Sequence, residues 1–174
     1  AADLTQGRAG SLRVGAGAGM GDQFLAAACS TMLMEAPKVT LTLAIAPNAM
    51  LLPALRNGEY DLVVSGITRG SPDDLTQEKL YDDDFVVYCC RDHQLARRKQ
   101  VTLSQLALER WALSAPDDLS WRAIHRAFED NGLPPPSVAF STTASVIRME
   151  TVASSDLVSF SSWRVLQRIW IQFP

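Results

Sequence analysis

Apolar and polar positions alternate along the chain with two periods, and their order predicts an α/β protein. Three apolar runs, 12–16, 39–45 and 61–66, predict strands, the last of them buried. Between them, residues 22–36 and the segment from Asn48 carry apolar side chains at helical spacing. The first 66 residues therefore predict β-α-β-α-β, the unit that builds a parallel sheet with right-handed crossovers.

Particular residues mark the ends of these elements. Pro37 should stop the first helix. Asn48 should cap the second helix, Gly58 should end it, and Pro53 inside it should shorten or kink it. Apolar residues alternate with threonine in 39–45, which favours a half-buried or edge strand.

A second series of strands and helices begins near residue 85. A helix over 120–131 should bury Trp121, Ile124 and Phe128 on one face and end at Asn131-Gly132. The other expected elements are strands at 85–90, 110–115, 137–140 and 156–162, a short helix from Thr102, and a capped helix within 141–153.

The segment "SLRVGAGAGMGDQF" places glycines at alternate positions between a strand and a helix. A dinucleotide fingerprint is broken, because Met20 or Asp22 stands where its third glycine belongs and no acid ends the next strand. A helix amino end at 20–22 can still hold an anion through free N–H groups and its dipole. A tight turn without any ligand stays open as the alternative.

Composition and charge exclude several classes of function. The 174 residues are 47% hydrophobic with a net charge of −3, so this chain alone is a poor nucleic-acid binder. We expect the basic cluster at 97–99 and the acidic run at 82–84 to be solvated. No apolar run is long enough to span a bilayer, so we expect no membrane association.

Candidate catalytic and metal-binding groups are sparse. Cys29, Cys89 and Cys90 are expected to be reduced and mostly buried, which suits a cytoplasmic protein. His93 lies in a charged segment without a nucleophile nearby, and His125 is expected to face solvent. We therefore predict no catalytic residue, no metal and no cofactor.

The order of the pieces resembles the effector-binding domain of LysR-type transcriptional regulators, from about Gly10 to Ser162. The segment "NGEYDLVV" is similar to the family's acid-Gly-Glu-Leu-Asp-Leu piece. The segment "RDHQLARRKQVTLSQLA" is similar to its Asp-His-Pro-Leu-Ala…Leu-x-x-Leu piece, with Gln94 in place of proline.

The resemblance implies two Rossmann-like α/β subdomains of the periplasmic-binding-protein type II fold, with a ligand cleft between them. The implied parts are the end of a linker at 1–10, subdomain I at 11–84, subdomain II at 85–162 and a C-terminal segment, 163–174, that is truncated or irregular. The family's winged helix-turn-helix and its usual C-terminal return are expected to lie outside this sequence.

The implied function is effector sensing without catalysis. A small molecule, with anions among the candidates, would bind in the cleft, and DNA would be bound only through the absent N-terminal domain. The alternatives are a solute-binding protein and an enzyme on the same fold. The residues predicted to contact the effector are Gly17, Gly19, Met20, Asn48, Ile67, Thr68, Ser120, Thr142, Thr143, Ser145 and Phe160.

Self-association is predicted from the helix at 22–36. Its apolar residues spread over more than one face, so one face can pack on the sheet while another stays exposed on a monomer. The resemblance also implies antiparallel pairing of two such domains, and we predict a homodimer. The alternative is a helix fully buried within one subunit.

Overall fold

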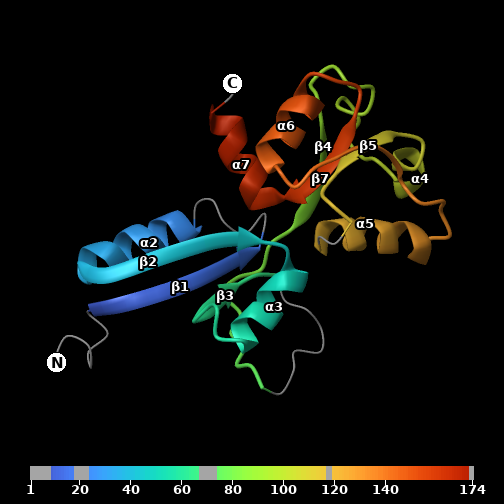
Figure 1. The fold of residues 1–174 in the computed structure, drawn as a ribbon. Coiled ribbons are helices and arrows are strands. Elements are labelled where there is room, and N and C mark those ends of the chain that lie inside the picture. The colour runs from blue at the N-terminus through green and yellow to red at the C-terminus, as the bar shows by residue number, and fades with distance from the viewer. Residues whose placement is uncertain (1–8, 18–23, 67–73, 117–118, 173–174) are drawn as a thin grey trace. The chain divides into compact units, whose positions relative to one another are not determined.

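The computed structural model describes residues 9–17, 24–66, 74–116 and 119–172, with side chains described up to residue 167 (Figure 1). The chain divides into two compact units, Ala1–Tyr81 and Asp82–Pro174. The predicted boundary, between residues 84 and 85, lies three residues closer to the C-terminus than the observed boundary between residues 81 and 82. Both units are α/β, as the sequence predicts.

Unit 1 is a three-stranded parallel sheet with two helices. The strand order is β2-β1-β3, so β2 is an edge strand, as its alternating pattern predicts. The elements are β1 (Ala9–Gly17), α2 (Phe24–Glu35), β2 (Lys38–Ala46), α3 (Asn48–Arg56) and β3 (Leu62–Val64). The prediction that 61–66 is a buried strand is wrong: β3 covers three residues at the other edge, and Leu62 is 40% exposed.

The start of α3 differs from the prediction, whereas its end agrees with it. Asn48 is the first helical residue and not the cap, because Pro47 has extended backbone and its carbonyl accepts the N–H groups of Met50 and Leu51. Pro53 lies inside α3, which still reaches Arg56. Gly58 has a φ of +71° and its N–H donates to Leu55, which makes it the predicted helix stop.

The glycine-rich strand packs closely against α3. A Cβ placed on Gly15 would lie 2.8 Å from Leu51 Cδ2 and 3.0 Å from the ring of Tyr60. Leu51 is fully buried, so it has little room to move away. At Gly15 the absence of a side chain is therefore a packing requirement.

A carboxylate clamp joins β1 to the segment before β3. The Asp61 carboxylate accepts the backbone N–H of Arg13 at 2.7 Å and two guanidinium N–H groups at 2.8 and 3.2 Å. The Asp61 N–H donates to the Arg13 carbonyl at 2.8 Å. Hydrogen bonds from the Arg13 side chain lower the pKa of Asp61, and the same contact raises the pKa of Arg13.

Unit 2 is a four-stranded mixed sheet. The order is β4-β7-β5-β6; β5, β6 and β7 are parallel, and β4 runs antiparallel to β7. The elements are β4 (Phe85–Cys89), α4 (Leu103–Leu106), β5 (Arg110–Leu113), α5 (Leu119–Asp130), β6 (Ser137–Ser141), α6 (Ser145–Ala153), β7 (Val158–Ser162) and α7 (Trp163–Gln172).

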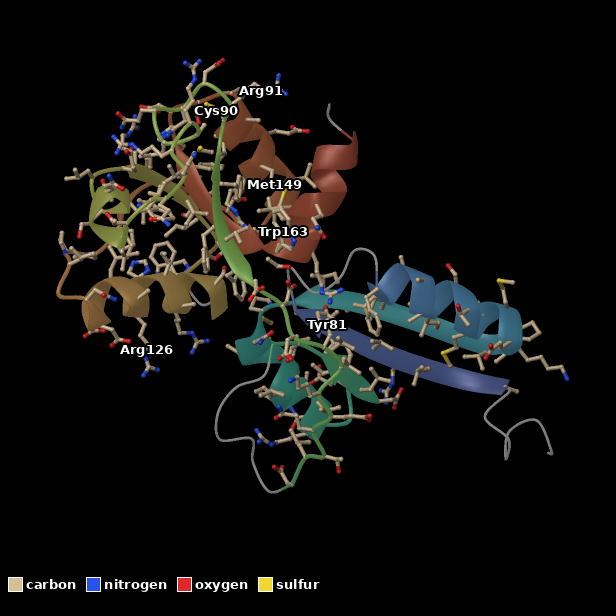
Figure 2. All side chains as sticks on the ribbon, turned by 180° about the vertical axis from the view of Figure 1, so that it is seen from behind. Tyr81, Cys90, Arg91, Arg126, Met149 and Trp163 are labelled. Carbon is tan, nitrogen blue, oxygen red and sulfur yellow. The ribbon has the colours of Figure 1, made fainter. Side chains whose placement is uncertain are left out.

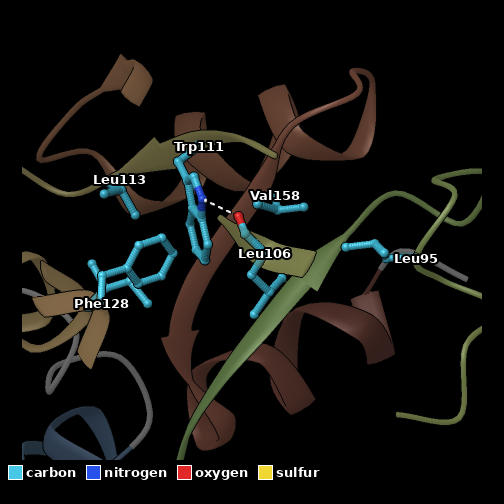
Figure 3. Close-up of a cluster of buried hydrophobic side chains, with 7 residues drawn as sticks. Leu95, Leu106, Trp111, Leu113, Phe128 and Val158 are labelled. Carbon is cyan, nitrogen blue, oxygen red and sulfur yellow. Dashed lines mark hydrogen bonds between the residues drawn. The ribbon is translucent and has the colours of Figure 1, made fainter. Parts of the chain in front are cut away.

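The main core of unit 2 forms around Trp111, which is fully buried. Its indole N–H donates to the Leu106 carbonyl at 3.1 Å, and its ring meets Phe128 edge to face at 5.9 Å (Figure 3). Ile124 and Phe128 point into this core from α5, and Trp121 packs against it, as the predicted apolar face requires. The capping box between Thr102 and Gln105 confirms the predicted helix start.

Two predictions at the surface of unit 2 are wrong. His125 is half-buried and does not simply face solvent, because its ring stacks on Trp121 at 4.4 Å. The C-terminal segment was predicted to be truncated or irregular, and the second alternative is wrong because residues 163–172 form a helix. The Ser162 hydroxyl accepts the N–H of Val165 at the helix start, and Leu166 is buried.

The acidic run at 82–84 is only partly solvated. Asp82 and Asp84 are exposed, but the Asp83 carboxylate accepts the hydroxyl of Ser162, and the Asp84 carbonyl accepts the Trp163 N–H at 2.7 Å. These contacts join the beginning of β4 to the end of β7. The basic residues 97–99 are exposed, as expected.

Candidate functional site

Predicted ligand residues of unit 1 lie where its parallel strands end. Because β1, β2 and β3 run the same way, their carboxyl ends share one edge of the sheet. Gly17 ends β1, and Asn48 begins α3 directly after β2. Ligands of α/β sheets bind at this kind of edge. The predicted residues Gly19, Met20, Ile67 and Thr68 lie outside the described residues.

In unit 2 the corresponding edge gathers several hydroxyl groups. The strands β5, β6 and β7 are parallel and end at Leu113, Ser141 and Ser162. The predicted residues Thr142 and Thr143 occupy the turn between β6 and α6, and Ser145 is the first residue of α6. Ser120 lies in the first turn of α5, after β5. All four therefore belong to the carboxyl edge of this sheet.

The turn before α6 is held by Thr142. Its N–H donates to the Leu113 carbonyl at 3.2 Å, and its hydroxyl accepts the Ala144 N–H at 3.1 Å. Ala144 is the residue at the helix cap, and no side chain caps α6. The predicted capping by a hydroxyl is therefore wrong, since Thr142 is too early in the turn and bonds its own loop. Thr143 is exposed and Ser145 is half-buried.

Ser114 was not predicted, although it follows β5 directly. It is buried, and its hydroxyl lies 2.6 Å from the hydroxyl of Ser120. Arg148, a buried residue on α6, was also not predicted. The available signal for Ser114 was its position as a polar residue immediately after a strand. The signal for Arg148 was its position four residues before Val152, because residues four apart lie on the same face of a helix.

Phe160 is placed in the middle of β7 and not at its end. Its ring stacks on Phe85 of β4 at 4.9 Å, with an interplanar angle of 16°, and it packs against the main core of unit 2. Its contact with an effector stays a prediction.

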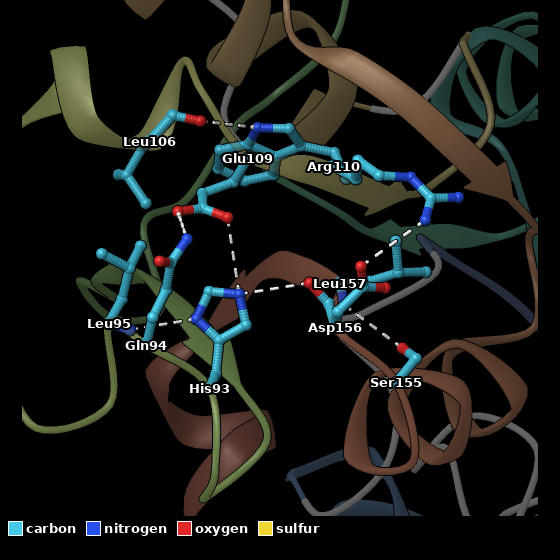
Figure 4. Close-up of polar contacts among 10 residues, drawn as sticks. His93, Gln94, Leu95, Leu106, Glu109, Arg110, Ser155, Asp156 and Leu157 are labelled. Atoms are coloured by element: carbon cyan, nitrogen blue, oxygen red, sulfur yellow. Dashed lines mark hydrogen bonds and ion pairs between the residues drawn. The ribbon is translucent and has the colours of Figure 1, made fainter.

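His93 is the centre of a buried polar cluster in unit 2 that was not predicted from the sequence (Figure 4). Its Nδ1 accepts the Leu95 N–H at 3.1 Å, so the ring proton belongs on Nε2. Nε2 lies 3.1 Å from the Asp156 carbonyl and 3.5 Å from a carboxylate oxygen of Glu109. The cluster holds the segment after β4 against the turn before β7.

Gln94, the residue that departs from the family pattern, belongs to the same cluster. Its side-chain amide donates to the buried Glu109 carboxylate at 2.8 Å. A proline could not supply this hydrogen bond. The arrangement supplies hydrogen-bond partners to the buried polar groups of His93 and Glu109.

The three cysteines are the remaining groups that could be reactive. Cys29, Cys89 and Cys90 are free and half-buried. Burial raises the pKa of Cys89, which keeps the thiol protonated and weakly nucleophilic. Among the described residues, no three His, Cys, Asp or Glu side chains come together as metal ligands. In the same part of the chain, no helix has the length and apolar character to cross a membrane.

Comparison with known proteins assigns the family. The sequence model described as "LysR substrate binding domain" matches residues 5–169. The chain belongs to this family. Its two α/β units are those of the LysR substrate binding domain, and they confirm the fold that the order of the sequence pieces predicted.

Curated relatives of this LysR substrate binding domain are longer proteins. The small neutral protease regulatory protein of Streptomyces coelicolor is 31% identical over 126 residues, which are 67% of this chain and 40% of the relative. A probable RuBisCO transcriptional regulator of Phaeodactylum tricornutum is 28% identical over 106 residues, 60% of this chain and 34% of the relative. The chain thus covers well under half of these relatives.

Solved structures share the fold of this LysR substrate binding domain at low sequence identity. The CcmR regulatory domain of Synechocystis PCC6803 in complex with 2-PG has a TM-score of 0.78 and 18% identity, over 90% of this chain and 74% of that one. The effector binding domain of QuiR in complex with shikimate has a TM-score of 0.77 and 16% identity, and the match covers 88% of this chain and 74% of that one.

Proposed function

We propose that this chain is the effector-sensing part of a DNA-binding transcriptional regulator. The observation that carries the proposal is the carboxyl edge of unit 2, where Thr142, Thr143, Ser145 and the uncapped amino end of α6 meet. This edge supplies hydroxyl groups and backbone N–H groups to a small molecule. Related LysR domains have been solved with shikimate and with 2-PG.

The proposed mechanism contains no chemical step. A small molecule that binds one conformation of the domain better than another shifts the population toward it. The DNA-binding portion, outside the 174 residues, would respond to that shift. A regulator of this kind works where the DNA is, so we place it in the cytoplasm. A purified chain that converts a metabolite with a measurable kcat would contradict this mechanism.

The test of the ligand site uses one variant in each unit. A compound is first selected from a metabolite library by its effect on the melting temperature. Thr143→Val should weaken a compound that binds at the edge of unit 2, and Asn48→Ala one that binds at the edge of unit 1, in each case by about tenfold in calorimetry, the loss expected for one hydrogen bond to a ligand. Asn57→Ala is the matched control, because Asn57 lies at the opposite end of α3. Unchanged affinity in both site variants would refute the assignment.

We also propose that the domain pairs with a second copy through α2 and β2. Large apolar side chains on these two elements are exposed, with Met34 at 82% and Ile45 at 55%. Phe24, Leu33 and Leu43 are 40–45% exposed on the same elements. Exposed apolar surface of this kind marks an interaction site, and a closed two-fold pairing is the commonest oligomer.

Light scattering tests this pairing. Met34→Glu or Ala27→Glu should give folded monomers at concentrations where the unmodified chain is dimeric, because each places a charge in the apolar surface. Met50→Glu is the control, since Met50 is 63% exposed but lies on α3. An unmodified chain that is already monomeric at high micromolar concentration would contradict the proposed pairing through α2 and β2.

A further inference from the structure

Arg148 on α6 carries a buried positive charge for which the described residues supply no counter-ion. The residue is 6% exposed, and its Nε has no hydrogen-bond partner. Among the described residues the polar contacts of its guanidinium amount to one long hydrogen bond, from Nη1 to the Thr142 carbonyl at 3.5 Å, and no ion pair. A guanidinium has five N–H donors and a permanent charge, so most of its bonding capacity is unused.

The charged end of Arg148 lies at the amino end of α6. Val152 is one turn further along the helix and belongs to a buried cluster with Ala112 and Leu157, so this stripe of α6 faces the sheet. The guanidinium nevertheless reaches Thr142, which precedes the helix. This is the direction in which long helical side chains lean. The aliphatic part of the Arg148 side chain therefore packs on the sheet, and its guanidinium lies at the carboxyl edge of that sheet. Figure 2 shows α6 with the neighbouring Met149 labelled.

The backbone adds further donors at the same place. No side chain caps α6, a helix of nine residues, so the N–H groups of its first turn have no partner within the helix. The positive end of the helix dipole points the same way.

We propose that Arg148 and the amino end of α6 bind an oxyanion, a carboxylate or a phosphate, carried by the effector. This inference rests on the proposed function, and it restricts the effector to compounds that carry a carboxylate or a phosphate. Two oxygens of such a group match the planar guanidinium fork, and a third can accept a helix N–H. An uncharged ligand would leave the buried cation uncompensated, so Arg148 selects against it.

The test measures melting temperature with simple anions. Inorganic phosphate and acetate are added separately to the full 174-residue chain at constant ionic strength, balanced with chloride. One of them should raise the melting temperature of the wild type, and the one that does identifies the oxyanion. Arg148→Met should abolish the rise. Arg126→Met, which removes an exposed arginine and the same charge, should keep it (Figure 2).

The stability without added anion gives a second, independent readout. Because an uncompensated buried charge is costly, Arg148→Met should melt at or above the wild-type temperature in chloride alone. An arginine with a purely structural role would give a lower melting temperature. Arg148→Lys retains the charge but not the fork, and should fold and bind the anion about tenfold more weakly.

Three results would overturn the inference: no rise in the wild type, an equal rise in Arg148→Met, or a lower melting temperature of that variant in chloride. An uncharged effector that binds the wild type and Arg148→Met equally would also overturn it, but would leave the proposed function intact. A phosphate or acetate response without binding of any metabolite would instead contradict the proposed function alone.

Discussion

At the residue scale, the clamp between Asp61 and Arg13 makes unit 1 sensitive to acid. The pKa of Asp61 is lower in the folded chain than in the unfolded chain, chiefly through the hydrogen bonds of the Arg13 side chain. The stabilisation is therefore fully present above the unfolded-state pKa of about 3.9 and is lost as the pH falls through the lower, folded value.

The variant Asp61→Asn tests this prediction by urea unfolding at several pH values. It should be less stable than the wild type at pH 7, and the difference should shrink as the pH falls below about 4, where the wild-type carboxylate takes up a proton. A difference that stays constant from pH 7 to the acid limit would contradict the role given to the clamp.

His93 shows how a residue that looks exposed in the sequence can be essential to a core. The sequence places it among charged residues, whereas both ring nitrogens are used inside unit 2. His93→Ala would leave the Leu95 N–H and the Asp156 carbonyl unpaired. We predict a loss of about 1–3 kcal/mol in the free energy of unfolding. His125→Ala, on the surface of α5, should cost less; equal losses would contradict the cluster's importance.

At the scale of the element, strong periodicity predicted most helices and strands correctly. The spacing of Ile124 and Phe128 on α5 matched the observed burial, because this helix buries one side. In β2 the alternation matched only at the start of the strand, where Val39 is buried, whereas Leu43 and Ile45 are exposed. The errors fall where another group decides the local structure. The Pro47 carbonyl starts α3 without Asn48, and the Ser162 hydroxyl supports the start of α7.

Close packing between β1 and α3 explains why position 15, one of the alternating glycines, has no side chain. Gly15 faces Leu51 and Tyr60 at distances that leave no room for a side chain. Gly15→Val should therefore lower the free energy of unfolding by about 1–3 kcal/mol, measured by urea denaturation. A neutral substitution would mean that α3 can move away from the sheet without cost.

At the scale of the molecule, the division into two α/β units was predictable from the repeated strand-helix order. The candidate site was predictable only in part. The positions of Thr142, Thr143 and Ser145 between β6 and the start of α6 were predictable because a polar segment follows a strand and precedes a helix, and their contact with a ligand stays a prediction. Arg148 and Ser114 were missed, because their positions in the sequence indicate the element to which each belongs but not that the polar side chain is buried.

The measurement that tests the central claim most directly is a crystal structure of the chain with a compound selected by thermal shift. We predict the compound within hydrogen-bond distance of the Thr142–Ser145 turn at the amino end of α6, with an oxyanion facing Arg148. Density for the compound at any other surface, with that edge of unit 2 occupied only by water, would contradict the account.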